Sequence, residues 1–315
     1  MNYKSSGVDI EAGDAFVNRL KTKLPSIGGF NGMFKVPSGY EEPILVSGAD
    51  GVGTKIKIAR IADDYTTIGQ DLVAMCVNDV ICCGAKPLYF LDYISTKKLD
   101  SNVDDIISGI IKGCEITGIE LLGGETAEHY RATEYDLAGF CTGIVEKRDI
   151  VNGTSIRPGD KIIGIESSGL HSNGYTLIND MIWVEDKYYP YKYEKLMPGL
   201  LTPTTIYAPL IQSLLDEVPI LGMAHITGGG IPGNLPRCIG HHHMTANVDY
   251  SSWPRPEIFD RIKEAGDIKE EEMRNVFNLG IGFCIIVPEE TVIDTQTMIA
   301  DTPFGMRSWV IGEIK

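Results

Sequence analysis

The sequence contains no long apolar run, and its basic residues are outnumbered by acidic ones. No apolar stretch approaches the ~20 residues that a membrane-spanning helix needs, and residues 1–9 lack the apolar core of a secretion signal. Lys and Arg number 28 against 43 Asp and Glu, a formal net charge of −15. General binders of nucleic acid or anionic membranes depend on clustered basic residues. We therefore expect a soluble cytoplasmic protein without nucleic-acid or membrane partners.

Cysteine patterns typical of zinc sites and disulfide frameworks are also missing. The seven cysteines are scattered without a C-x-x-C pair, and Cys82 and Cys83 are adjacent. This spacing predicts buried free thiols rather than metal ligands or disulfides. The run His241 to His243 is not expected to bind a metal either, because three consecutive residues cannot face one ion without strain.

Apolar residues and glycine are abundant. Hydrophobic residues make up 43% of the chain, which has 35 glycines and no low-complexity tract. This composition is typical of a folded, loop-rich protein of helices and strands, and 315 residues suffice for two domains. The polar, turn-rich run from Asn152 to Asp160 is a candidate boundary. We predict an N-terminal domain over residues 1–153 and a C-terminal domain over 154–315.

The stretch from Gly48 to Lys55 predicts a glycine loop between a strand and a helix. Glycines let backbone N–H groups approach a ligand, and a helix N-terminus adds partial positive charge, so phosphate is the expected ligand. In a P-loop the lysine directly follows the last glycine, whereas here Thr54 intervenes. Asp50 inside the loop would repel phosphate unless a cation lay between them. We expect metal-bridged phosphate, with an ordinary tight turn as the alternative.

The strongest helix pattern covers residues 66–83. Asp71 and Asn78 are seven residues apart and lie within about 20° on the helix surface, and Asp79 lies about 80° from Asp71. A solvated edge would carry longer Lys and Glu side chains, so these short polar residues favour binding of metal or phosphate. For Asp71 the alternative is compensation of the helix dipole.

Three more glycine-rich stretches follow predicted strands. Residues 123–128 combine glycines with carboxylates, the oxygen ligands that Mg²⁺ prefers. Residues 167–174 contain His171 among Ser and Asn, which donate hydrogen bonds to an anion without a metal. Residues 224–232 place His225 and three glycines before a helix. A further segment, 28–34, is either a flap over a nucleotide or a plain connection.

Together these stretches resemble the phosphoribosylformylglycinamidine cyclo-ligase family, the aminoimidazole ribonucleotide synthetases, over essentially the whole chain. The stretches that carry the resemblance are Gly7 to Ile10, Val46 to Lys55, Thr67 to Asp79, Phe90 to Tyr93, Gly123 to Glu128, Asp136 to Cys141, Ser167 to Tyr175 and His225 to Gly230. The resemblance implies an α+β fold of two domains, with mixed and antiparallel sheets and helices packed on one face. It also implies a homodimer formed through the N-terminal domain sheet.

The family's reaction converts formylglycinamidine ribonucleotide and ATP to aminoimidazole ribonucleotide, ADP and phosphate, with Mg²⁺. An amide oxygen is a poor leaving group, so phosphorylating it allows the amidine nitrogen to displace it and close the imidazole ring. This chemistry agrees with the predicted loops. A small-molecule ribonucleotide is therefore the expected substrate, in purine biosynthesis.

The resemblance and the loops assign candidate residues to four roles. The metal ligands would be Asp50, Asp71 and Asp79. ATP would be bound by Gly28, Gly29, Gly32, Gly48, Asp50, Gly51, Gly53, Thr54, Lys55, Asn78, Gly123, Gly124, Glu125 and Thr126. The ribonucleotide would be bound by Ser168, His171, Ser172, Asn173, His225, Thr227, Gly228, Gly229 and Gly230. Lys55 would neutralise the phosphoryl charge, and His171 and His225 would move protons, with the acid and the base unassigned.

Two alternatives stay open. Another phosphoryl-transfer enzyme of the superfamily, such as selenophosphate synthetase or thiamine-monophosphate kinase, is one, although residues 28–34 lack the cysteine expected of the former. A non-catalytic maturation scaffold is the other, and its expected C-terminal cysteine tail is not seen in residues 312–315. The chain departs from the family in a short segment after Glu128, in Gly233 where an acid is usual, and in Leu279 where Cys is usual.

Overall fold

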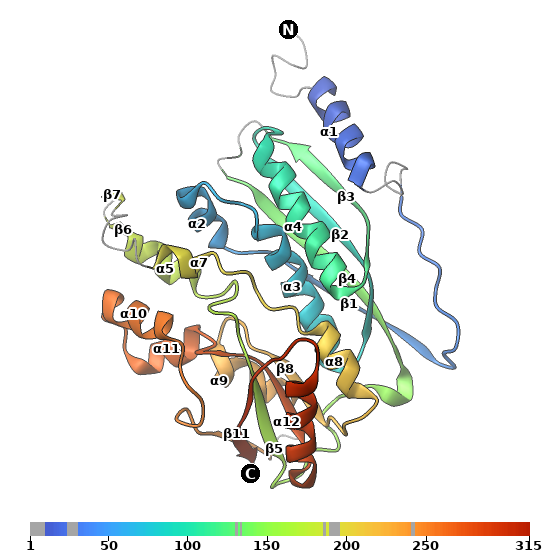
Figure 1. Ribbon diagram of the computed structural model, residues 1–315, viewed down its shortest axis with the longest axis vertical. Coiled ribbons are helices and arrows are strands. Elements are labelled where there is room, and N and C mark those ends of the chain that lie inside the picture. The colour runs from blue at the N-terminus through green and yellow to red at the C-terminus, as the bar shows by residue number, and fades with distance from the viewer. Residues whose placement is uncertain are drawn as a thin grey trace.

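The computed structural model describes residues 10–23, 31–129, 132, 134–184, 187–188, 196–240 and 243–315, which form two sheets flanked by helices (Figure 1). The first half comprises α1 (Ile10–Lys23), β1 (Pro43–Asp50), α2 (Lys55–Ala62), α3 (Ile68–Val80), η2 (Ile81–Cys83), β2 (Lys86–Thr96), α4 (Ser101–Thr117), β3 (Glu120–Glu128), β4 (Asp136–Glu146) and η3 (Lys147–Asp149). The second half comprises β5 (Lys161–Glu166), α5 (Tyr175–Ile182), β6 (Trp183–Val184), β7 (Lys187–Tyr188), α7 (Met197–Leu200), α8 (Ala208–Leu215), β8 (Gly222–His225), α9 (Gly230–Asn234), η4 (Leu235–Cys238), β9 (Ala246–Val248), α10 (Glu257–Gly266), α11 (Glu270–Val276), β10 (Ile281–Val287), η5 (Glu289–Thr291), α12 (Val292–Asp301) and β11 (Ser308–Ile314).

The first sheet is mixed and has the strand order β1-β4-β2-β3. Strand β4 runs antiparallel to β1 and β2, whereas β2 and β3 are parallel and are joined by α4. Helices α3 and α4 pack together against one face of this sheet (Figure 1). Helix α3 is apolar on most of its surface because it packs against the sheet, against α4 and against the second half of the chain.

The second sheet is entirely antiparallel, in the order β8-β10-β5-β11-β9. All seven residues of β10 are buried, which requires cover on both faces. Ile285 and Ile163 face a core that α3, α4 and α8 share, while Ile286 and Ile162 face a separate core beneath α9 and η4. The α+β fold with mixed and antiparallel sheets is therefore confirmed, and the two halves share one hydrophobic core.

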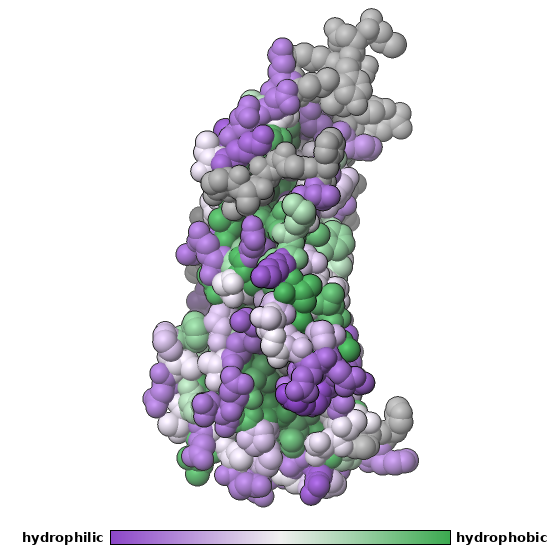
Figure 2. All heavy atoms as spheres, turned by 90° about the vertical axis from the view of Figure 1, so that its right-hand side faces the viewer, coloured by the Kyte–Doolittle hydropathy of each residue, from purple (hydrophilic) through white to green (hydrophobic). Residues whose placement is uncertain are grey.

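The outer face of the first sheet is not covered by helices. Leu45, Tyr93 and Phe140 on β1, β2 and β4 are 59%, 41% and 44% exposed. Figure 2, which looks at the right-hand side of Figure 1, shows apolar side chains gathered over the middle of this side of the molecule. Among the described helices, none is both long and apolar enough to span a membrane.

Candidate functional site

The loop at residues 51–54 lies between β1 and α2, as the sequence predicts. Gly53 has a φ of +53°, which a residue with a side chain rarely adopts. A Cβ on Gly51 would lie 2.9 Å from the Leu137 carbonyl oxygen, so this glycine allows the loop to pass close to β4. The loop lines a cleft of about 660 Å³, together with Asp50 and residues from the ends of β2, β3 and β4.

Close packing of α3 against β1 brings two acidic residues together beside this cleft. A Cβ on Gly48 would lie 3.3 Å from Val80 and 3.9 Å from the Cβ of Asp79, so only a small residue at position 48 permits this approach. Asp50 follows Gly48 on the same face of β1, because side chains alternate along a strand. Asp79 and Asp50 therefore lie close to each other at the end of β1.

His225 completes this group from the other half of the molecule. It is the last residue of β8, its ring is fully buried, and its Nδ1 lies 2.8 Å from Oδ1 of Asp79, whose side chain is 48% exposed. A carboxylate only accepts hydrogen bonds, so Nδ1 carries the proton and donates it to Asp79. The other ring nitrogen, Nε2, is buried and has no hydrogen-bond partner among the described residues.

The environment of Asp50 agrees with this grouping. The pKa of Asp50 is raised above its ordinary value. Burial is the largest cause and the charge of Asp79 adds to it, whereas the hydrogen bond from the Gly51 N–H and the charge of His225 oppose it. The Gly51 N–H donates to Asp50 Oδ1 at 2.7 Å. Asp50, Asp79 and His225 thus interact electrostatically, although they come from three separate elements.

A second cavity of about 360 Å³ lies between the two halves and is lined by Asp79 and His225. Val46 lines this cavity, whereas Asp50 lines the 660 Å³ cleft. Both residues lie on the same face of β1, with Gly48 between them. The group formed by Asp50, Asp79 and His225 therefore lies between two cavities, one in the first half and one between the halves.

His171 lies next to this group in a buried loop. Its φ is +62° and its ring centroid is 6.5 Å from that of His225. Burial holds the pKa of His171 well below its ordinary value, and His225 and Lys55 lower it further, so the ring is neutral. Neither ring nitrogen has a hydrogen-bond partner among the residues that the structure describes. Buried polar atoms normally have partners, so this ring is a candidate contact for a ligand or water.

The loops that were predicted to bind the ribonucleotide lie side by side. Asn173 Oδ1 accepts a hydrogen bond from the Gly228 N–H at 2.9 Å. Ser168 donates to the Pro203 carbonyl, and Ser172 shares a hydrogen bond with Thr204. The bond between Asn173 and Gly228 joins the first loop, residues 167–174, to the second, residues 227–230, while Ser168 and Ser172 hold the first loop against residues 203–204. The structure therefore brings both predicted substrate loops to the same region.

Gly229 and Gly230 have φ values of +96° and +58°, and a Cβ on Gly230 would meet the Arg274 carbonyl. Helix α9, which follows, has only five residues. These glycines are therefore needed for the turn and for packing against α11. Because α9 is short, a helix dipole contributes little to anion binding here.

Lys55 and Asp71 form a buried ion pair. Lys55 Nζ lies 2.8 Å from Oδ2 of Asp71, and both side chains are 0% exposed. Lys55 also donates to the carbonyl oxygens of His171 and Thr202, and Asp71 accepts from the N–H and hydroxyl of Thr204. These contacts occupy both groups, and neither residue lines the cavities described here. Their roles in phosphoryl transfer and metal binding stay predictions.

Asn78 is likewise bonded within the protein, and its role in binding ATP stays a prediction. It is fully buried, donates to the Thr205 carbonyl and accepts from the Tyr207 N–H. The polar edge of α3 that the sequence predicts does exist, but Asp71 and Asn78 bind the backbone of residues 202–207. Asp79 is the member of this edge that faces a cavity.

The second predicted glycine loop, residues 123–126, is instead part of β3 and pairs in parallel with residues 91–94 of β2. A Cβ on Gly124 would lie 2.1 Å from Oδ1 of Asp92, so this glycine makes room for a buried carboxyl group. Gly123, Glu125 and Thr126 lie in the strand with it and do not line the 660 Å³ cleft. Gly48 is likewise within β1, where it pairs with Cys141.

Of the predicted flap, Gly28 and Gly29 lie outside the described residues. Gly32 packs against Leu122 of β3, where a Cβ would meet the Leu122 side chain.

Among the described residues, no group of three or more His, Cys, Asp or Glu side chains could hold a metal ion. Of the predicted ligands, Asp71 is paired with Lys55, whereas Asp50 and Asp79 lie beside the cavities. Asp50 and Asp79 suit Mg²⁺, which commonly binds one or two carboxylates together with phosphate oxygens and water.

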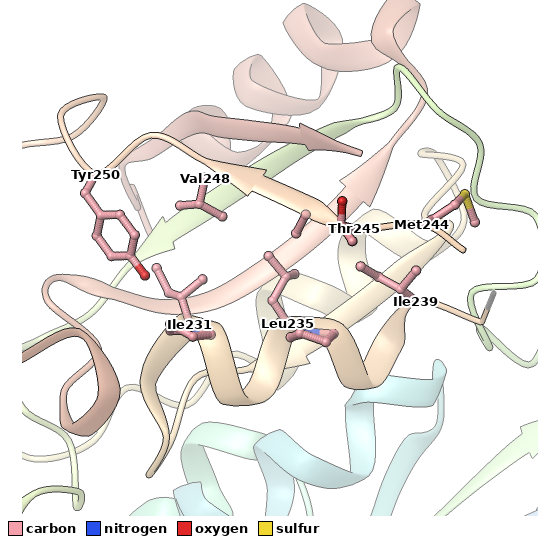
Figure 3. Close-up of a pocket in the computed structure, with 10 residues that line it drawn as sticks. Ile231, Leu235, Ile239, Met244, Thr245, Val248 and Tyr250 are labelled. Carbon is pink, nitrogen blue, oxygen red and sulfur yellow. The ribbon is translucent and has the colours of Figure 1, made fainter. Parts of the chain in front are cut away.

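A third cavity, of about 550 Å³, lies between β9 and the segment formed by α9 and η4. Figure 3 shows Ile231, Leu235 and Ile239 along one side of this segment, facing β9. None of the predicted site residues lines it.

Sequence reasoning also missed residues that do line the other two cavities, among them Lys57, Glu134, Asn152 and Arg237. No local signal marks them, because Lys57 and Glu134 meet only through the folding of the first half, and Asn152 and Arg237 share their cavity with Asp79 only through the packing of the two halves.

Comparison with known proteins identifies the family. The family model described as AIR synthase related protein, N-terminal domain, matches residues 34–145, and the corresponding C-terminal domain model matches residues 157–315. A phosphoribosylformylglycinamidine cyclo-ligase of Synechococcus sp. (strain CC9902) is 46% identical over 335 residues, covering 100% of this chain and 95% of the relative. A protein of the same name from Myxococcus xanthus (strain DK1622) is 46% identical over 334 residues, covering 99% and 95%.

Solved structures share the fold at lower identity. Thiamine-monophosphate kinase from Stenotrophomonas maltophilia K279a has a TM-score of 0.68 at 17% identity, covering 96% of this chain and 93% of the kinase. Hydrogenase maturation protein HypE in complex with ATP has a TM-score of 0.66 at 18% identity, covering 95% and 86%. The two domain models and the full-length relatives together show that the chain belongs to the phosphoribosylformylglycinamidine cyclo-ligase family.

Proposed function

We propose that this protein is an ATP-dependent cyclo-ligase that converts formylglycinamidine ribonucleotide to aminoimidazole ribonucleotide, ADP and phosphate in purine biosynthesis. The family supports this activity. The observation that carries the proposal is the 2.8 Å contact of Asp79 with His225 beside Asp50, between two cavities. ATP would occupy the 660 Å³ cleft and the ribonucleotide the 360 Å³ cavity, so that the reacting groups meet at these three residues. The ATP complex of the similarly folded HypE is consistent with an ATP site in this fold.

Asp50 and Asp79 would hold Mg²⁺, which would offset the negative charge of the phosphates. The backbone N–H groups of residues 51–54 would bind the phosphates of ATP, as glycine loops do at helix N-termini. Lys57, which lines the same cleft, is a cation available to these phosphates. Lys55 would act indirectly, by fixing the start of α2 through its buried contacts.

His225 is arranged as the base of ring closure. Its Nδ1–H is held by Asp79, so the lone pair is on Nε2, which has no partner among the described residues. In the reaction the amide oxygen takes the γ-phosphoryl group, the amidine nitrogen bonds to the amide carbon, and the C–O bond breaks to release phosphate. The nitrogen loses a proton, which Nε2 of His225 would accept. His171, which is neutral and buried, would hydrogen-bond the substrate.

The experiment is incubation of the purified protein with ATP, Mg²⁺ and formylglycinamidine ribonucleotide. We expect diazotisable aminoimidazole ribonucleotide and an equal amount of ADP. Thiamine monophosphate in place of the ribonucleotide tests the kinase alternative. ADP formed only with thiamine monophosphate, or nucleotide bound without any turnover, would contradict the cyclo-ligase assignment.

We further propose a cytoplasmic homodimer in which the outer face of the first sheet packs against a second copy. Leu45, Tyr93 and Phe140 on that face are exposed in the single chain, and contiguous apolar patches commonly mark interaction surfaces. The sheet would then be covered on both faces, with α3 and α4 on one side and the second copy on the other.

A further inference from the structure

The cavity between the two halves contains a cation that the proposed mechanism does not use. Arg237 lines this cavity and is the sole Lys or Arg among the described residues that do so. No ion pair joins Arg237 to a carboxylate within the part of the chain that the structure describes. Most other described arginines form such pairs, namely Arg19, Arg60, Arg148, Arg255, Arg261, Arg274 and Arg307. In a chain with a net charge of −15, an arginine without a carboxylate partner in a cavity is unusual.

The fold orients Arg237 through Asn234. Asn234 is 3% exposed, and its Nδ2 donates to the carbonyl oxygens of Thr227, Gly228 and Gly230. These bonds fix the side-chain amide, so that Oδ1 accepts from Arg237 Nη1 at 3.3 Å. One buried amide therefore connects the predicted substrate loop to the arginine.

The two sides of the segment formed by α9 and η4 line different cavities. Ile231, Leu235 and Ile239 face the apolar cavity beside β9 (Figure 3). Asn234 and Arg237 line the cavity between the halves instead. The segment is thus apolar toward its own core and polar toward the site.

The segment that packs on the end of η4 adds a second donor, Asn152. Gly153 packs so closely on the end of η4 that a Cβ would meet the Cys238 carbonyl, which holds Asn152 at the cavity. Asn152 Oδ1 already accepts from the Thr154 N–H and hydroxyl, so its NH₂ group is the part that can donate to a ligand. The acidic residue of this cavity, Asp79, is engaged with His225. Asp79 and His225, which line this cavity, are thus paired with each other, and Arg237 is the cation of the cavity that can meet a ligand.

We propose that Arg237 binds the phosphate ester of the ribonucleotide substrate, with Asn152 as a second donor. This inference rests on the proposed function. A planar guanidinium suits a phosphate dianion, because it forms two parallel charge-assisted hydrogen bonds. A phosphate bound at Arg237 would leave the amide and amidine of the substrate to meet Asp79 and His225, which line the same cavity.

The test compares ligands with and without the phosphate in Arg237→Ala, with Arg261→Ala as the matched control. Arg261 is a half-exposed arginine of α10 that pairs with Glu257 and lines none of these cavities. We expect Arg237→Ala to raise the Kd of formylglycinamidine ribonucleotide about tenfold to a hundredfold. The Kd of the dephosphorylated riboside and the KM for ATP should not change. The Kd of the ribonucleotide for Arg237→Lys should fall between the values for wild type and Arg237→Ala, because lysine keeps the charge and loses the forked geometry.

Calorimetric binding of ribose 5-phosphate, measured without ATP, decides the role of Arg237 separately from turnover. Wild type and Arg261→Ala should bind this probe, and Arg237→Ala should lose binding. If Arg237→Ala binds the ribonucleotide and the riboside more weakly by the same factor, Arg237 has a structural role and the proposal is overturned. Binding of ribonucleotide and ribose 5-phosphate that is unchanged in Arg237→Ala would also overturn it. If the wild type binds ribose 5-phosphate through Arg237 but forms no aminoimidazole ribonucleotide, the cyclo-ligase assignment fails and the phosphate site stands.

Discussion

Lys55 and Asp71 form an ion pair with both side chains fully buried where the two halves of the molecule meet. The lysine comes from the first turn of α2 and the aspartate from the first turn of α3. Both also bind the backbone of the second half, at Thr202 and Thr204. Burial lowers the pKa of Lys55, and Asp71 opposes that shift. The pair therefore joins the two halves beside the proposed active site.

Removing one member of this pair should destabilise the fold. Lys55→Met leaves an uncompensated buried carboxylate, and we expect a loss of about 3–5 kcal/mol in the free energy of unfolding. Urea denaturation monitored by circular dichroism measures it. Lys57→Met, on the same helix and facing the cleft, is the control and should stay within about 0.5 kcal/mol of wild type. A stable Lys55→Met protein that has lost only turnover would support direct catalysis by Lys55 instead.

Asp79→Asn should abolish most activity without unfolding the protein. The amide loses the charge that holds His225 and that would bind Mg²⁺, so we expect kcat to fall about 100-fold to 10,000-fold. Because Asp79 is 48% exposed, the melting temperature should change little. Steady-state kinetics over a range of Mg²⁺ concentrations, with Asp294→Asn on the surface of α12 as control, measures the effect. Turnover equal to that of wild type would remove Asp79 from the mechanism.

Asp92 should make stability depend on pH. Burial raises the pKa of Asp92 from 3.8 to about 7, so the folded state binds its proton more tightly than the unfolded state does. The resulting stabilisation is complete below pH 3.8 and is lost as the pH rises to about 7, by roughly 1.4 kcal/mol per pH unit. Urea midpoints of wild type should fall across this window more than those of Asp92→Asn. Parallel pH profiles for the two proteins would contradict this account.

Gly124 and Gly123 provide a matched test of β3. A Cβ at Gly124 would lie 2.1 Å from Asp92, whereas at Gly123 the nearest atom is 3.8 Å away. We expect Gly124→Ala to cost about 1–3 kcal/mol of stability through overpacking. Gly123→Ala should cost much less, as thermal unfolding would show. If both variants are as stable as wild type and bind ATP weakly, the glycines serve a nucleotide loop after all.

The proposed dimer is tested on the outer face of the first sheet. The double variant Leu45→Lys and Phe140→Lys places two charges on that face, where the native side chains are exposed in the single chain. Sedimentation equilibrium should give a dimer for wild type and a monomer for the variant, because burying unpaired charges is costly. A monomeric wild-type protein would reject the dimer.

Local patterns in the sequence determined most helices and strands. The sequence predicts a helix over residues 66–83, and α3 and η2 together cover residues 68–83. Continuous apolar runs and apolar residues at helical spacing are properties of short segments, so they can be read without the fold. The same holds for the loop after Asp50, where Gly53 has a positive φ.

Only the tertiary structure decided which polar residues face a cavity. Asp71, Asn78 and Asp79 share one edge of α3, yet the backbone of residues 202–207 binds the first two and leaves Asp79 facing His225. Arg237 reaches the same cavity from a position more than 150 residues later in the chain. Each of these contacts joins residues far apart in sequence, and their energies depend on burial and on partners that no local pattern contains. The sequence by itself therefore determined the elements and the family, and the packing of the two halves decided which of the candidate residues meet.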